Sequence, residues 1–175
     1  MNKLNIVLFE PLIPQNTGNI MRTCVAINAQ LHLIKPLGFE LDETKLKRSA
    51  LDYYEYIDYK LYENYQDFCK KNPGEYYFLT RYADKTYSDV KYNDVKTNIY
   101  LIFGKETTGI DKSILKNNLE NCFRIPTTDK VRSINLSNCV ALVSYEVLRQ
   151  LDFVGLSKEE PEIHKGKDFL KNIIN

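Results

Sequence analysis

Arg22 is the first side chain in the sequence whose setting suggests chemistry, because a guanidinium can orient an oxygen-rich substrate and stabilise negative charge. It lies in PQNTGNIMRTC, residues 14–24, where Pro14 excludes helix just before it and Asn16 or Thr17 can cap a first turn. The apolar residues here recur at helical spacing, at Ile20, Cys24 and Ile27. Arg22 falls on the opposite face, toward solvent, a ligand or a second subunit. Taken alone, such a segment is more often a capped surface helix with one solvated arginine.

A second segment, NIYLIFGKETTGI at residues 98–110, predicts a buried strand that runs into a loop between Gly104 and Gly109. Ligands often bind beyond the carboxyl ends of parallel strands, where glycine lets them approach the backbone. The loop is no ATP-binding P-loop, because the earlier glycine is missing and Glu106 stands where Ser or Thr would bind magnesium. No GxGxxG follows Phe9, so dinucleotide binding is unsupported too. A tight turn explains the loop equally well.

A third segment, residues 124–150, runs from a strand end through a polar loop into a helix that Ser133 or Asn135 can cap. One face of the helix carries an apolar stripe of Leu136, Val140, Val143, Val147 and Leu151. The opposite face carries Asn138, Tyr145 and Arg149. These polar groups suit either an ordinary surface or a surface that orients a substrate or a second subunit, and the segment alone favours neither.

Short apolar runs alternate with segments of helical period along the chain, which predicts an α/β fold with a mostly parallel sheet flanked by helices. The expected strands are residues 4–9, 31–35, 76–80, 98–103 and 122–125. The expected helices are residues 17–29, 64–71, 111–118 and 136–150. Residues 53–62 suit a strand or an exposed loop, and residues 81–96 suit a polar loop.

Composition narrows the functional classes. The 175 residues suit one domain, and a net charge of +1 means that any nucleic acid must be bound by a local patch. Four widely spaced cysteines have neither zinc-site spacing nor the density of a disulfide scaffold, and His32 and His164 form no metal or catalytic pair. No membrane span or signal peptide is apparent, so a cytoplasmic protein is expected.

Together the three segments resemble the three ordered motifs of the SPOUT superfamily of RNA 2'-O-methyltransferases. The matching stretches are NTGNIMRTC, LIFGKETTGI and IPTTDKVRSINLSNCVALVSYE. The similarity covers roughly residues 4–155 and is greatest to the subfamily that methylates the ribose of the wobble nucleotide 34 in tRNA anticodon loops, on cytidine or a modified uridine. Three separated motifs in order are far more specific than any one of them.

The resemblance implies an α/β fold with a C-terminal trefoil knot, in a single domain of residues 1–156 followed by a tail of residues 157–175. It implies a homodimer that uses S-adenosyl-L-methionine, yields S-adenosyl-L-homocysteine and needs no metal. Transferred to this chain, the methyl donor would be held by Leu79, Gly104, Ile125 and Ser133.

The resemblance also assigns Arg22 to the attacking 2'-hydroxyl. A guanidinium keeps its proton at ordinary pH, so orienting the ribose and stabilising alkoxide charge suit it better than acting as a base. Tyr145 is the second catalytic candidate, and Asn135 and Glu106 are expected to shape the loops. Arg48, Lys130 and Arg132 are the candidates for binding the phosphates of a tRNA anticodon stem-loop.

Two other functions remain open on the sequence. One is the same chemistry on ribosomal RNA or at another tRNA position. The other is a non-catalytic RNA-binding dimer with the same fold, which the presence of Arg22, Gly104 and Ser133 disfavours.

Overall fold

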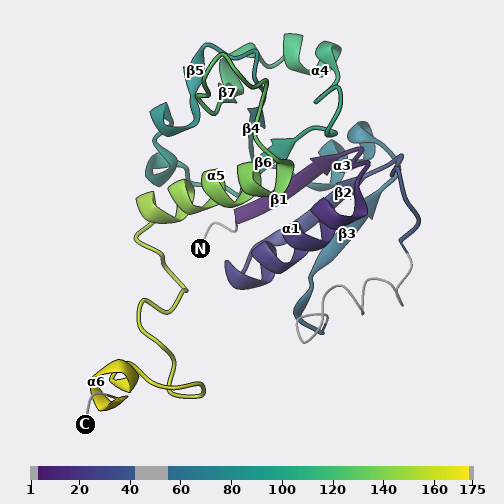
Figure 1. The fold of residues 1–175 in the computed structure, drawn as a ribbon. Coiled ribbons are helices and arrows are strands. Elements are labelled where there is room, and N and C mark those ends of the chain that lie inside the picture. Colours follow the sequence, from purple (N-terminus) through teal and green to yellow (C-terminus); the bar gives the residue numbers. More distant parts are fainter. Residues whose placement is uncertain (1–3, 42–54, 174–175) are drawn as a thin grey trace.

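Seven parallel strands form one sheet in the computed structural model, which describes residues 4–41 and 55–173 (Figure 1). The strand order is β3-β2-β1-β6-β4-β7-β5. Their bounds are β1 Leu4–Phe9, β2 Gln30–Ile34, β3 Tyr59–Tyr62, β4 Glu75–Leu79, β5 Lys85–Thr86, β6 Ile99–Phe103 and β7 Cys122–Arg124. The predicted α/β class with a parallel sheet is therefore confirmed.

Both faces of the sheet are covered, which explains why β1 and β6 consist almost entirely of buried apolar residues. Alternate side chains of β1 enter opposite layers of the core. Ile6 and Leu8 pack in the cluster that contains residues of helices α1 (Pro14–Ala26) and α5 (Leu136–Gln150). Val7 and Phe9 pack in the cluster that contains residues of α3 (Tyr65–Lys71) and α4 (Lys112–Lys116). Helices α1 and α5 contact each other on the first face.

The start of α1 differs from the prediction. The helix begins at Pro14 with Ile13 as its N-cap, and no side chain caps it. Proline is well tolerated there because its missing N–H would have no partner within the helix anyway. Asn16 and Thr17 therefore lie inside the helix and are buried, so the expectation that one of them caps it was wrong. For α5 the prediction was right, since the Asn135 side chain accepts a hydrogen bond from the Ser137 amide.

The segments between the main strands and helices differ in detail from the predicted secondary structure. The ambiguous stretch at 53–62 ends in β3, and the predicted polar loop at 81–96 contains β5 and two 3-10 turns, η2 (Tyr87–Asp89) and η3 (Tyr92–Asp94). A third 3-10 turn, η4 (Leu119–Asn121), precedes β7. After α5 the chain leads away from the sheet to a short helix, α6 (Phe169–Ile173) (Figure 1). No helix in the described ranges is long and apolar enough to cross a membrane.

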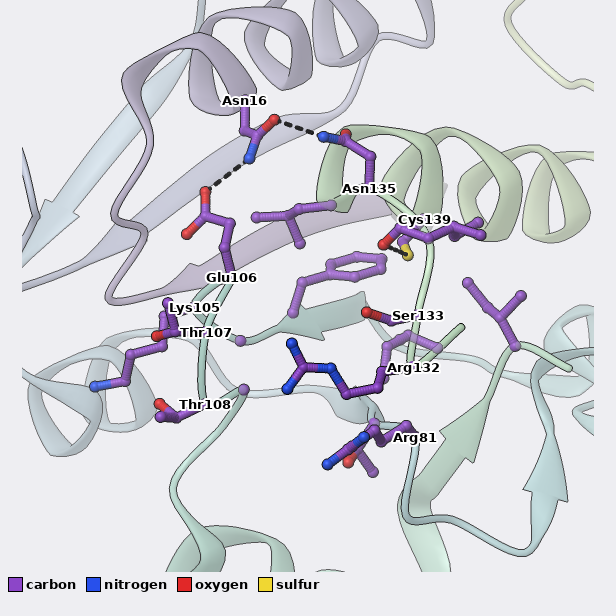
Figure 2. A pocket seen from close by; sticks show the side chains of 18 of the residues that line it. Asn16, Arg81, Lys105, Glu106, Thr107, Thr108, Arg132, Ser133, Asn135 and Cys139 are labelled. Carbon is purple, nitrogen blue, oxygen red and sulfur yellow. Dashed lines mark hydrogen bonds between the residues drawn. The ribbon is translucent and has the colours of Figure 1, made fainter. Parts of the chain in front are cut away.

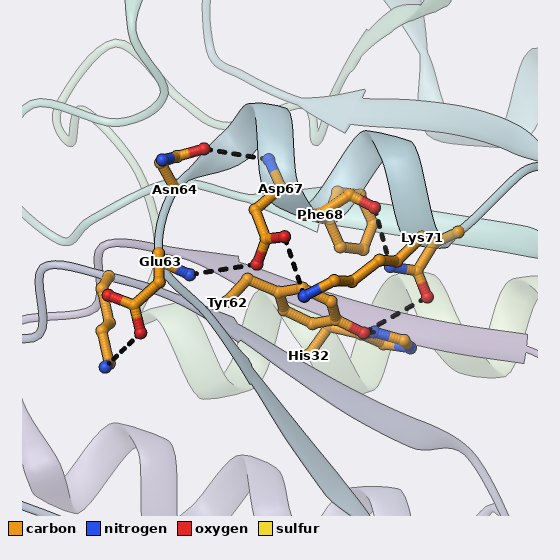
Figure 3. Close-up of polar contacts among 9 residues, drawn as sticks. His32, Tyr62, Glu63, Asn64, Asp67, Phe68 and Lys71 are labelled. Atoms are coloured by element: carbon orange, nitrogen blue, oxygen red, sulfur yellow. Dashed lines mark hydrogen bonds and ion pairs between the residues drawn. The ribbon is translucent and has the colours of Figure 1, made fainter.

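A closed polar network lies in the core, and we call His32, Tyr62, Asn72 and Asn5 the interior network. Figure 3 shows His32 and Tyr62 of this network beside α3. The His32 ring lies 2.8 Å from the Tyr62 hydroxyl through Nδ1 and 3.1 Å from the Asn5 carbonyl oxygen through Nε2. Tyr62 donates to Asn72 over 3.2 Å. His32 is fully buried and is surrounded by the rings of Tyr62, Phe68 and Tyr100. These contacts give His32 a structural role, because they connect β2 to β1 and β3 in the core.

Candidate active site

A cavity of about 540 Å³ lies beyond the carboxyl ends of β4, β6 and β7. These three strands are neighbours in the sheet. On one side of β6 the strands run β1, β2 and β3 out to the sheet edge. On its other side they run β4, β7 and β5 out to the opposite edge. Such a reversal leaves a crevice at the strand ends, which is where open parallel sheets usually bind ligands.

The four residues predicted to hold a methyl donor all line this cavity. Leu79 ends β4, Gly104 follows β6, Ile125 follows β7, and Ser133 lies in the loop before α5. Segments separated by more than 50 residues in the sequence therefore meet at one place. Phe103, Leu136 and the aliphatic members of the set supply apolar wall, while Thr80, Thr107 and Asn135 supply polar groups. Both the volume and this mixed lining suit a ligand the size of a nucleoside derivative.

The loop from Gly104 to Gly109 forms one wall and depends on both glycines. The Gly109 amide donates to the Lys105 carbonyl over 3.0 Å, so the loop closes on itself. A Cβ at Gly104 would overlap with the backbone of Gly109 and Ile110. Gly109 has space around it but adopts φ +76°, which favours glycine. Gly104 is thus required by the contact of the loop with itself, which agrees with the tight turn that the sequence left open beside the approach of a ligand.

A second polar network joins all three motif segments, and we call Glu106, Asn16 and Asn135 the cavity network (Figure 2). The Glu106 carboxylate accepts hydrogen bonds from the backbone amides of Leu12 (2.9 Å) and Ile13 (3.2 Å) and from the Asn16 side chain (2.9 Å). The Asn16 carbonyl oxygen accepts from Asn135 over 3.0 Å. The burial of Asn16, unexplained by the helix itself, follows from these contacts. Glu106 and Asn135 shape the loops, as expected, and Asn16 is a member that the sequence did not indicate.

Several charged and reactive groups surround the cavity. Lys105 pairs with Glu10 at one side of it. Burial raises the pKa of the Cys139 thiol to about 11, so this cavity-lining cysteine is protonated at neutral pH. No group of three or more His, Cys, Asp or Glu in the described part of the chain could hold a metal ion.

Arg81 and Tyr82 also line the cavity, directly after β4, and were missed in the sequence. The Arg81 guanidinium donates to the Tyr82 hydroxyl over 2.8 Å. That hydrogen bond and the Arg81 charge, with Lys112 and Arg132 contributing, hold the pKa of Tyr82 below its ordinary value. A signal was available, because both residues immediately follow a predicted strand whose carboxyl end faces the ligand edge.

The remaining predicted site residues are distributed differently. Arg132 lines the cavity, while Lys130 is exposed and does not line it. Arg22 on α1 and Tyr145 on α5 are exposed, as the helical pattern predicted, and neither lines the cavity of its own chain. Arg48 lies outside the described residues. The structure therefore unites the predicted donor residues and leaves the predicted catalytic pair on the outer surface of the two packed helices.

Comparison with known proteins agrees with this geometry. The model of the SpoU rRNA Methylase family matches residues 3–145. A protein of Geobacillus stearothermophilus with the provisional name tRNA (cytidine(34)-2'-O)-methyltransferase is 46% identical over 155 residues, covering 88% of this chain and 99% of its own. A Yersinia pestis protein named tRNA (cytidine(34)-2'-O)-methyltransferase is 44% identical over 164 residues, covering 90% of this chain and 99% of its own.

Solved structures agree as well. A provisionally named RNA methyltransferase from Bacillus anthracis superposes with a TM-score of 0.85 at 44% identity, covering 89% of this chain and 99% of its own. A structure described as giving insights into the 2-OH methylation of C/U34 on tRNA has a TM-score of 0.78 at 35% identity, covering 86% of this chain and 97% of its own. With the family model matching most of the sequence and relatives matching over nearly their whole length, this chain belongs to the SpoU methylase family.

Proposed function

We propose that the protein transfers a methyl group from S-adenosyl-L-methionine to the ribose 2'-oxygen of nucleotide 34, a cytidine or modified uridine, in tRNA anticodon loops. The observation that carries the proposal is the meeting of Leu79, Gly104, Ile125 and Ser133 on one cavity of suitable size. The names of the relatives, which match along almost the whole of their own length, supply the substrate.

In this proposal Leu79 and Ile125 provide apolar contact for the donor, while Gly104 and Ser133 bring loop backbone close to it. The donor supplies an activated methyl group on a sulfonium. The sulfur leaves as a neutral thioether, and the proton of the 2'-hydroxyl passes to water. The described residues include no cluster that could hold a metal ion. The transfer does not require one, because the thioether that leaves carries no charge to be stabilised. What the protein must add is orientation of the 2'-hydroxyl in line with the methyl carbon, a contribution that can be large.

Arg22 is the proposed catalytic residue, orienting the ribose and stabilising negative charge that develops on its 2'-oxygen. Tyr145 is proposed to hydrogen-bond the same region of the RNA. Since neither lines the cavity of its own chain, we propose a homodimer in which a second copy brings them to the donor. The exposed apolar residues Ile13 on the edge of α1 and Leu142 on α5, beside Tyr145, support burial of this surface.

The same proposal includes the finer features implied by the SPOUT resemblance. These are a C-terminal trefoil knot, a methyltransferase domain of residues 1–156 with a tail of 157–175, and a cytoplasmic location. Binding of the anticodon stem-loop is assigned to Lys130, Arg132 and Arg48. The knot would fit the way in which residues 133–136 and the Gly104–Gly109 loop line the same cavity.

Methylation of defined RNAs tests the proposal directly. Purified protein, labelled methyl donor and a tRNA transcript should give a 2'-O-methyl group at nucleotide 34, found by nuclease digestion and mass spectrometry. The matched control is the same tRNA with a 2'-deoxyribose at nucleotide 34, which has no acceptor oxygen and should remain unlabelled.

Ribosomal RNA is the second candidate, because the matching family model is described as that of rRNA methylases. Nucleosides from a deletion strain separate the two substrates. Loss of 2'-O-methylation at tRNA position 34 supports the proposal, whereas unchanged tRNA with altered rRNA contradicts it. Absence of donor binding in calorimetry would instead favour a non-catalytic RNA-binding protein.

A further inference from the structure

Arg81 and Tyr82 form an exposed pair at the edge of the cavity. The proposed methyl transfer gives neither residue a role. The Tyr82 side chain is 60% exposed although it is a large aromatic residue. The Arg81 guanidinium lies over the Tyr82 ring, with its central carbon 4.7 Å from the ring centroid, and donates to the Tyr82 hydroxyl over 2.8 Å. These two contacts hold the ring in place, and most of the side chain is exposed to solvent.

Positive charge gathers around this ring. Arg132 lines the same cavity, and Figure 2 shows the guanidinium groups of Arg81 and Arg132 at the same edge of it. The charges of Lys112 and Arg132 make small contributions to lowering the pKa of Tyr82. Within the described ranges, neither Arg81, Lys112 nor Arg132 forms an ion pair with a carboxylate.

Two other lysines, Lys105 and Lys85, are each paired with a carboxylate. Lys105, on another side of the cavity, pairs with Glu10, and Lys85, at the start of β5, pairs with Glu120. Among the described cations that line the cavity, Lys105 is therefore neutralised by a carboxylate, whereas Arg81 and Arg132 are not. Cations that face one another without counter-charges repel, and a bound anion would relieve that repulsion.

An exposed ring beside unpaired guanidinium groups is the combination that binds unpaired RNA, since bases stack on aromatic faces and phosphates bind arginine. We propose that Tyr82 stacks on an unpaired base adjacent to the methylated nucleotide while Arg81, with Arg132, binds the neighbouring phosphate. This inference rests on the proposed function, because it assumes that RNA enters the cavity from this edge. The donor also carries an anion, its carboxylate, but a ring that faces solvent suits a large substrate that arrives after the donor.

Binding measurements on four single variants test the inference. Affinity for a fluorescent anticodon stem-loop is measured by anisotropy over a series of salt concentrations. Tyr82→Ala should weaken binding roughly 10-fold to 100-fold, and Tyr82→Phe, which keeps the ring, should stay within about twofold. Arg81→Ala should weaken binding and reduce the slope of log affinity against log salt by about one contact. Lys85→Ala is the matched control, because it removes one positive charge from an ion pair outside the cavity lining, and it should bind like the unmodified protein.

Calorimetry with S-adenosyl-L-methionine separates the two sources of an anion. Each variant should keep its donor affinity within about twofold, and the exposed position of both side chains should leave the melting temperature nearly unchanged. A loss of donor affinity with unchanged RNA affinity would assign Arg81 to the donor carboxylate and overturn the inference. RNA affinity equal to that of the unmodified protein in Tyr82→Ala and Arg81→Ala would also overturn it. Unmodified protein that neither binds nor methylates the stem-loop contradicts the proposed function, and the inference falls with it.

Discussion

The interior network and the cavity network are built from similar polar side chains but differ in what surrounds them. His32, Asn5 and Asn72 are buried, and the Tyr62 hydroxyl joins His32 and Asn72 beneath α3 (Figure 3). Glu106, Asn16 and Asn135 instead all line the cavity, although Asn16 between the other two is itself buried (Figure 2). The first network is closed, whereas the second has one side toward a ligand site.

The contrast separates stability from function within one small protein. Buried polar groups that satisfy one another are costly to disturb, because each loss leaves a partner without water or a hydrogen bond. The cavity network connects the three motif segments across 90 residues or more, so its loss would change the shape of the site. Changes at the cavity should therefore alter ligand affinity and turnover first, and changes in the interior should alter the free energy of unfolding first.

The largest expected effect lies wholly on the functional side. Arg22→Ala should lower the methylation rate about 100-fold or more, since it removes a donor that acts on developing charge in the transition state. Donor affinity and melting temperature should remain nearly unchanged, because Arg22 is exposed and is proposed to act on the ribose and not on the donor. Arg22→Lys, which keeps the charge but loses the planar fork, should give an intermediate rate. Single-turnover kinetics measure the rate, and undiminished turnover in Arg22→Ala would remove Arg22 from the mechanism.

The interior network supplies the opposite extreme. His32→Ala should lower the free energy of unfolding by about 3–4 kcal/mol. The substitution opens a cavity and removes one hydrogen-bond partner from the Tyr62 hydroxyl and one from the Asn5 carbonyl oxygen. Urea denaturation measures the loss. At temperatures where the variant remains folded, its donor affinity should equal that of the unmodified protein. A specific loss of donor affinity would show that the two networks are coupled.

Glu106→Gln tests the cavity network where it contributes to both properties. Leu12 donates to one Glu106 oxygen, whereas Ile13 and Asn16 both donate to the other. A glutamine has one carbonyl oxygen, so its NH2 group must face at least one of these donors. We expect a loss of about 1–2 kcal/mol in unfolding free energy and roughly tenfold weaker donor binding, measured by urea denaturation and calorimetry. The matched control is Glu63→Gln, which breaks an exposed ion pair with Lys35 and should cost less than about 1 kcal/mol. Equal effects from both variants would show that Glu106 is only a surface charge.

The smallest effect is a change in the reactivity of a thiol. With a pKa of about 11, Cys139 should react slowly with iodoacetamide at pH 8, and its rate should rise about tenfold per pH unit until that pKa is reached. Because Cys139 lines the cavity, saturating methyl donor should slow its alkylation severalfold. Cys69 on α3 does not line the cavity and serves as the internal control in the same mass spectra. Equal protection of both thiols, or of neither, would place the donor elsewhere.

Most of the fold could be predicted from local pattern. The expected strands agree with the structure within about two residues, because fully buried strands are strongly apolar and end at turn residues. The outward faces of Arg22 and Tyr145 followed from helical periodicity. The strand β5 was missed because two residues, Lys85 and Thr86, are too short to show any period.

The site was predictable only where the motifs carried it. Asn16 looked like a helix cap because local spacing allows that role, but its side chain is held by Glu106, 90 positions away. The pair of Arg81 and Tyr82 was overlooked since neither residue belongs to a motif, although both follow a predicted strand. Their shared cavity with Arg132, 50 positions further along the chain, exists only in three dimensions. Contacts between segments distant in sequence leave no periodic trace.

The bonds from the Leu12 and Ile13 amides to Glu106 also constrain how the chain matures as it is synthesised. The two amides precede α1 near the amino terminus, and their acceptor is made more than 90 residues later. Until that residue leaves the ribosome, the beginning of α1 lacks the carboxylate that fixes it, so the helix can gain its final position only after β6 has joined the sheet. Long-range closure of this kind slows folding, and truncated chains that end before residue 106 should leave this end of α1 unanchored.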